Sequence, residues 1–137
     1  MKKEKSAGAI LFKKNGEIEY LLLHYEEGHW DFPKGHIEEN ETDIEALKRE
    51  IVEETSIKDV EIIKCFKENI HYFFRSEGGL VSKDVVFYLV KTKTKRVKLS
   101  HEHIGFKWLS FDESIDKLTF KNARNILKKA NDVLKKV

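Results

Sequence analysis

The chain has 137 residues, of which 36% are charged and 40% hydrophobic, and 26 Lys and Arg nearly balance 24 Asp and Glu to leave a net charge of +2. This length suits a single core, so we expect one domain spanning residues 1–137. The near-neutral sum excludes the uniformly basic surface of a general nucleic-acid or membrane-surface binder. No disulfide can form within the chain because Cys65 is its only cysteine, which favours a cytoplasmic setting.

No apolar run approaches the roughly 18 residues that a membrane-spanning helix needs. The polar N-terminal residues 1–6 are not followed by the apolar core of a signal peptide. We therefore expect a soluble protein that is not exported and has no membrane partner.

The first part of the chain predicts a hairpin followed by a shaped loop. Residues 7–12 and 18–25 have the apolar, β-rich composition of strands, and Asn15-Gly16 between them is typical of a hairpin turn. Residues 26–41 contain the only proline and two glycines. This composition indicates an irregular loop.

A helix is predicted over residues 42–55. Thr42 and Glu45 have the spacing of a capping box, and apolar residues then recur at helical intervals at Ile44, Leu47 and Ile51.

The rest of the chain mixes further strands with a final helix. Strands are expected at 60–66, 70–74, 85–91 and 104–109, a turn at Gly78-Gly79, and a helix over 118–137. Without regular alternation of strand and helix, this order predicts an α+β fold in which a mixed sheet packs against helices.

Three acids on the predicted helix carry the first chemical signal. Glu50, Glu53 and Glu54 are spaced i, i+3 and i+4, so they share one arc of the helix. Their mutual repulsion indicates that a cation compensates them. Carboxylate oxygens suit hard ions, so Mg²⁺ or Mn²⁺ is the expected metal.

The acids belong to a longer pattern. Gly35 is followed after five residues by Glu41 and, after seven more, by Arg49-Glu50-Ile51-x-Glu53-Glu54-x-Ser56-Ile57. This pattern resembles the box of the Nudix hydrolases, although that family usually has Gly where this chain has Ser56. Arg49 lies off the acidic arc, so we expect it to pair with Glu41 and hold the loop to the helix.

The resemblance implies the Nudix fold, an α/β/α sandwich with a central mixed sheet, and hydrolysis of a nucleoside diphosphate linked to another group. It extends beyond the box to segments that are similar to the asymmetrical diadenosine tetraphosphate hydrolases, which produce ATP and AMP. These segments are residues 29–36, 66–68 with Tyr72, 99–103 with 108–109, and 119–121.

Carried over by position, the resemblance implies roles for individual residues. Glu50, Glu53, Glu54 and Glu102 would bind the metal, and either Glu53 or Glu54 would take the proton of the attacking water. Lys34 and His29 would contact the polyphosphate beside Gly35, and Lys34 would also assist catalysis. Tyr72 and Phe120 would sandwich an adenine, although as core aromatics they would need no ligand. His24, His36 and His71 are expected to be structural or surface residues.

Two alternatives stay open at this stage. Within the same class, the substrate could be an RNA 5′ end, a nucleotide sugar or a damaged nucleoside triphosphate. In a different class, the chain could be a non-catalytic module that binds adenine nucleotides. Apart from an RNA 5′ end, no nucleic-acid partner is expected.

Overall fold

The computed structural model describes residues 1–136. Its elements in chain order are β1 (Lys2–Asn15), β2 (Glu17–Tyr25), β3 (Trp30–Asp31), β4 (Lys34–His36), α1 (Asp43–Thr55), β5 (Glu61–Ser76), β6 (Gly79–Lys91), β7 (His103–Leu109), α2 (Phe111–Lys117) and α3 (Lys121–Lys135). The strand order is β3-β2-β1-β6-β5, with β4 added to β1 and β7 to β2. β1 is parallel to β6 but antiparallel to β2 and β4, so the sheet is mixed.

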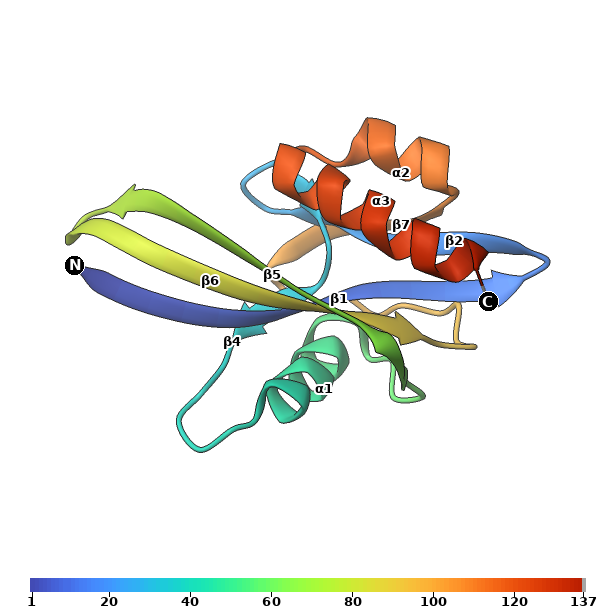
Figure 1. Ribbon diagram of the computed structural model, residues 1–137, viewed down its shortest axis with the longest axis horizontal. Coiled ribbons are helices and arrows are strands. Elements are labelled where there is room, and N and C mark those ends of the chain that lie inside the picture. Colours follow the sequence, from blue (N-terminus) through green and yellow to red (C-terminus); the bar gives the residue numbers. More distant parts are fainter. Residues whose placement is uncertain (137) are drawn as a thin grey trace.

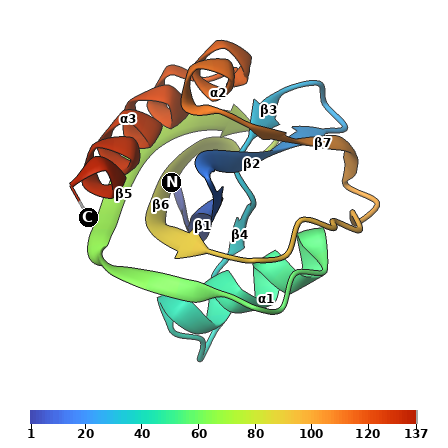
Figure 2. The same cartoon turned by 90° about the vertical axis from the view of Figure 1, so that its right-hand side faces the viewer.

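Helices cover both faces of this sheet (Figure 2), with α1 on one side and α2 and α3 on the other. The alternation of β1 explains the arrangement, because successive side chains of a strand point to opposite faces. Ile10 and Phe12 join the apolar core that includes α3, whereas Ala9 and Leu11 join the core that includes α1. The predicted α+β sandwich is confirmed.

Helix α1 begins and ends as its sequence requires. The Thr42 side chain accepts a hydrogen bond from the Glu45 backbone, and the Glu45 side chain accepts one from the Thr42 backbone, so the predicted capping box is confirmed. The helix ends at Ser56, whose φ of 65° is left-handed. Glycine adopts that conformation most readily, and the Ser56 hydroxyl donates a hydrogen bond to the Lys98 carbonyl there.

Several predicted boundaries are wrong. Residues 61–66 and 70–74 of the two predicted strands belong to one continuous strand, β5, whose pairing with β6 shifts register between Ile62 and Lys67. The final helix starts at Lys121 rather than 118, and the short helix α2 before it was not predicted. The loop at 26–41 contains the two short strands β3 and β4. Residue 137, the end of the predicted final helix, lies outside the described residues.

One end of the sheet projects beyond the helices. Figure 1 shows the first part of β1 and the β5–β6 hairpin extending together past α1 and α3. β1 changes neighbours along its length, with β4 beside residues 6–8 and β2 beside residues 12–15. The chain segment carrying Lys34 and Gly35 is thereby fixed against the middle of the sheet. Across the described residues, no helix has the length and apolarity needed to cross a membrane.

Candidate active site

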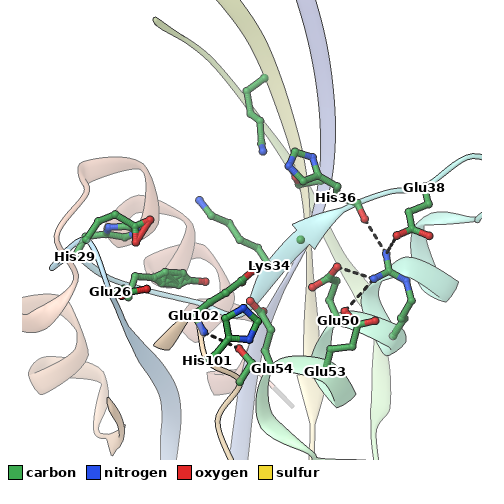
Figure 3. Close-up of a pocket in the computed structure, with 17 residues that line it drawn as sticks. Glu26, His29, Lys34, His36, Glu38, Glu50, Glu53, Glu54, His101 and Glu102 are labelled. Carbon is green, nitrogen blue, oxygen red and sulfur yellow. Dashed lines mark hydrogen bonds and ion pairs between the residues drawn. The ribbon is translucent and has the colours of Figure 1, made fainter. Parts of the chain in front are cut away.

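A cavity of about 1040 Å³ lies where α1, β4 and the loop before β7 meet. Figure 3 shows its lining, with the acids of α1 on one side, Lys34 and His36 above them, and Glu102 and His101 entering from the loop. The predicted site residues that line it are His29, Lys34, Gly35, Glu50, Glu53, Glu54 and Glu102. Tyr72 and Phe120 are absent from that lining.

The three acids of α1 differ in their surroundings. The Glu54 side chain is only 5% exposed and that of Glu50 14%, whereas Glu53 is 56% exposed. Burial raises the pKa of both Glu50 and Glu54, and partial compensation comes from Arg49 for Glu50 and from His103 for Glu54. A buried carboxylate and a partly buried one at the same site are therefore only partly compensated by neighbouring groups of the protein.

Gly35 allows the chain to pass directly over Glu50. Strand β4 pairs Gly35 with Ala7 of β1, which fixes its height above the helix. A Cβ atom at Gly35 would lie 1.9 Å from Glu50 Cδ and 2.2 Å from its Oε2. No side chain can occupy that space, so the glycine of the box is required by this contact.

Arg49 ties the loop before α1 to the helix. It donates to both carboxylate oxygens of Glu41, at 2.7 and 3.0 Å, and to the His36 carbonyl at 2.9 Å. The predicted Arg49–Glu41 pair is confirmed, and these hydrogen bonds lower the pKa of Glu41 to about 2. Arg49 also contacts Glu50 at 2.8 Å and Glu53 at 3.2 Å, so it supplies part of the positive charge that these acids were expected to receive from a metal alone.

The loop that carries Glu102 brings a fourth acid to the cavity. Carboxylate oxygens of Glu54 and Glu102 and a ring nitrogen of His103 lie within 4.8 Å of one another. Within the described chain, the buried oxygen Glu54 Oε1 has no hydrogen-bond partner. A buried carboxylate oxygen without a partner is costly, and a cation would satisfy it. The residues present therefore fit a divalent ion.

A buried carboxylate holds the Lys34 side chain in the wall of the cavity. Its Nζ lies 3.1 Å from Asp31 Oδ2, and the Asp31 side chain is 4% exposed. Burial opposes the charge on Lys34, but Asp31 and Tyr72 outweigh it and raise the pKa of the lysine. Lys34 is therefore a fixed cation at the rim of an acidic site, an arrangement suited to an anionic group.

The two predicted adenine-binding aromatics lie at the margin. Phe120 is 48% exposed just before α3, with its ring centroid 5.3 Å from that of His29. Tyr72 is half-buried on β5, beside Phe74. Among the described residues, no aromatic contact joins Tyr72 to Phe120.

The cavity also contains residues that sequence reasoning missed. The Lys83 side chain on β6 is 12% exposed and lies 3.4 Å from Glu4. His36, expected to be structural or a surface residue, is exposed but lines the cavity. Only the pairing of the strands brings these two residues to the cavity. His36 of β4 lies opposite Ser6 of β1, and Ser6 lies opposite Val85 of β6, the strand that carries Lys83.

Comparisons with known proteins agree with this geometry. The NUDIX domain model matches residues 2–130. The chain is 32% identical to the asymmetrical bis(5′-nucleosyl)-tetraphosphatase of Mus musculus, across 95% of each chain. The crystal structure of a C. elegans Ap4A hydrolase binary complex superposes with a TM-score of 0.82 at 29% identity, covering 98% of this chain and 99% of that one. An RNA pyrophosphohydrolase of Bartonella henselae is 33% identical over 53% of this chain and 47% of its own. The chain belongs to the Nudix family.

Proposed function

We propose that this chain hydrolyses diadenosine tetraphosphate to ATP and AMP. The observation that carries the proposal is the convergence of the α1 acids, Glu102 and Lys34 on one cavity. Similarity to asymmetrical tetraphosphatases extends over nearly the whole of both chains, so it includes the residues around the cavity as well as the box. The substrate would be an adenine dinucleoside polyphosphate, bound in a reducing, cytoplasmic setting.

The acids would hold the divalent ion, Mg²⁺ or Mn²⁺, that their charge requires. We assign Glu50, Glu53, Glu54 and Glu102 to this role, and the unpartnered oxygen of Glu54 supports the assignment. When bound, such an ion neutralises phosphate charge and polarises phosphorus for attack by water.

Two acids could take the proton of the attacking water, and their environments differ. Glu53 is exposed, and its carboxylate is already paired with the Arg49 guanidinium at 3.2 Å. Glu54 is buried and its pKa is raised by that burial. These differences support Glu54 as the general base.

The remaining predicted residues would bind the substrate. Lys34, held by Asp31, and His29 would contact the polyphosphate, with Gly35 allowing the backbone to approach. Lys34 would also stabilise the charge that develops during phosphoryl transfer. Tyr72 and Phe120 would provide stacking surfaces for an adenine, a contribution of about 1–3 kcal/mol per base.

Product analysis tests the reaction. The purified chain is incubated with diadenosine tetraphosphate and Mg²⁺ in water enriched in ¹⁸O, and the products are resolved by mass spectrometry. We expect ATP and AMP, with the heavy oxygen in AMP. Two molecules of ADP, or no turnover with tight adenine-nucleotide binding, would contradict the proposal.

A substitution tests the proposed role of Glu54 in the reaction. Glu54→Gln removes the charge and the base while keeping the shape, so kcat should fall by roughly 10²–10⁴-fold. The control is Glu39→Gln, an exposed acid on the loop before α1, which should leave kcat unchanged. Near-normal activity in the Glu54 variant would refute its role.

The match to an RNA pyrophosphohydrolase favours one other substrate, a 5′-triphosphorylated RNA. That match covers about half of each chain, whereas the tetraphosphatase match covers 95% of each. Values of kcat/KM for dinucleoside polyphosphates, nucleotide sugars and 5′-triphosphorylated RNA separate these alternatives. A preference for the RNA would replace the first proposal.

A further inference from the structure

His103 is a buried side chain at the start of β7 whose contacts face the acids of the cavity. The residue is 6% exposed. Its Nε2 lies 3.3 Å from Glu54 Oε2, and its Nδ1 lies 3.0 Å from the Ser100 hydroxyl. The ring also makes a T-shaped contact with the ring of Tyr25, with centroids 4.5 Å apart. The ring is therefore fixed on three sides.

The partners determine which nitrogen carries hydrogen. An ionised Glu54 can only accept, so the nitrogen that faces it must be Nε2–H. On the other side of the ring, Nδ1 lies 3.0 Å from the Ser100 hydroxyl, which can donate to it or accept from it. At 3.3 Å the contact falls short of an aligned hydrogen bond, and Nε2 has no other partner within the described chain. Glu54 is thus its sole polar target there.

The loop before β7, which carries Ser100 and Glu102, is attached to the end of α1 through backbone hydrogen bonds. Lys98 N–H donates to the Thr55 carbonyl at 3.0 Å, and Ser100 N–H to the Glu54 carbonyl at 3.4 Å. The Ser100 hydroxyl in turn accepts from Glu102 N–H at 3.4 Å. Ser100 therefore links both His103 and Glu102 to the helix residue that carries the buried acid.

We infer that His103 is a positioning residue, which orients the Glu54 carboxylate and, through Ser100, fixes its separation from Glu102. The inference rests on the proposed function in treating these two acids as partners in metal binding. His103 itself lies behind Glu54: its side chain has no exposed surface, whereas Glu102 is exposed to the cavity. A hard ion prefers the carboxylate oxygens to this nitrogen.

Three substitutions separate positioning from packing. His103→Gln places an amide N–H near the position of Nε2, His103→Asn places one nearer Nδ1, and His103→Leu provides neither. His71→Gln on β5 is the control, because His71 is exposed outside the cavity. Mn²⁺ binding to each protein is measured by electron paramagnetic resonance, together with kcat and KM for diadenosine tetraphosphate at saturating Mg²⁺.

We expect the Asn and Leu variants to bind Mn²⁺ 10–100-fold more weakly, the usual cost of losing a residue that orients a metal ligand. The Gln variant and the His71 control should stay near the wild-type value, and KM should change little in all four. Wild-type Mn²⁺ affinity in the Leu variant would overturn the inference, as would equal weakening of the Gln and Leu variants.

Spin-echo spectroscopy of bound Mn²⁺ provides a second test, in which the unaltered protein is compared with the His103→Gln variant because His29, His36 and His101 also line the cavity. Positioning predicts the same ¹⁴N coupling in both proteins, whereas strong coupling that is lost in the variant would make His103 a ligand and overturn the inference. Failure of the proposed function has a different signature. If the unaltered chain cleaves no dinucleotide but the Mn²⁺ affinities keep the expected order, the substrate assignment fails and the positioning role stands.

Discussion

Gly35 and Glu50 show how a single missing side chain determines the position of an acid. The contact leaves no room for a Cβ atom, which would overlap the carboxyl group of Glu50. We expect Gly35→Ala to displace Glu50 or β4 by about 1 Å, and a displacement of that size can lower activity by roughly 10²-fold. The measurement is kcat/KM at saturating Mg²⁺.

Gly78→Ala is the matched control for this change. Gly78 lies in the β5–β6 turn, and a Cβ atom there would meet no heavy atom within 4 Å. That variant should keep full activity. If both variants are equally active, Glu50 does not depend on the glycine as described.

The site residues that could be predicted from the sequence are those that local helical spacing brings together. Glu50, Glu53 and Glu54 are within one helical turn of each other, and the Arg49–Glu41 pair follows from the entry to the same helix. Lys83 and His103 could not be predicted in this way, because strands distant in the sequence bring them to the cavity. His103 does belong to the 99–103 segment that resembles the tetraphosphate hydrolases, but the sequence did not indicate that its side chain is buried.

At the scale of elements, the two hydrogen bonds from Arg49 to Glu41, here called the Arg49 clamp, join the 37–42 loop to α1. They use the planar guanidinium group, which lysine lacks. Arg49→Lys should therefore raise the pKa of Glu41 from about 2 toward its ordinary value of 4.5. It should also lower the free energy of unfolding near neutral pH. The measurements are an NMR titration of the Glu41 carboxyl and urea unfolding.

The pH dependence of the stability that Glu41 contributes follows from the downward shift of its pKa. A carboxyl whose pKa is lowered by folding contributes stability above its unfolded pKa and loses that contribution as pH falls through its folded value. For Glu41 the window runs from about pH 4.5 down to about 2. The reverse exchange at exposed Lys48, Lys48→Arg, is the control. A Glu41 pKa that stays near 2 in the Arg49 variant would refute the clamp.

Elements with strong local signals were predicted best. The helix at 42–55 was found to within a residue because a capping box and an apolar stripe mark it. By contrast, β5 was divided in two because Lys67 and Glu68 interrupt its apolar pattern. Only its long pairing with β6 keeps those residues in the strand. Helix α2 is seven residues long, too short for periodicity to indicate it.

Across the whole molecule, a buried hydrogen bond joins α3 to the sheet. Tyr20 on β2 donates to Asn131 Oδ1 at 2.7 Å, and both residues are buried. Tyr20→Phe leaves the Asn131 oxygen without its partner and should cost about 1–3 kcal/mol of unfolding free energy. Because the pair lies outside the cavity, kcat should be unchanged.

Tyr88→Phe provides the comparison for that prediction. Tyr88 is also buried in the sheet, on β6, but its hydroxyl makes no hydrogen bond within the described residues. Its removal should therefore change the urea midpoint much less. Equal losses in the two variants would mean that the hydrogen bond is not what stabilises α3.

Charge is also organised at this scale. Residues 38–61 contain ten acids and three bases, a net charge of −7, so the remainder of the chain carries +9. The near-zero sum correctly excluded a uniformly basic molecule, but it concealed an acidic site within a basic frame. Such a frame attracts polyanions, and the proposed divalent ion would offset their repulsion from the acidic centre.

The parallel pairing of β1 with β6 has a consequence for biosynthesis. Lys2 lies opposite Val81 and Phe12 opposite Lys91, so β1 leaves the ribosome well before its central partner β6 is made. Until then β1 can form only its hairpin with β2 and its short contact with β4. Contacts of such long sequence separation slow folding, and the nascent chain must keep an apolar strand from aggregating while it waits.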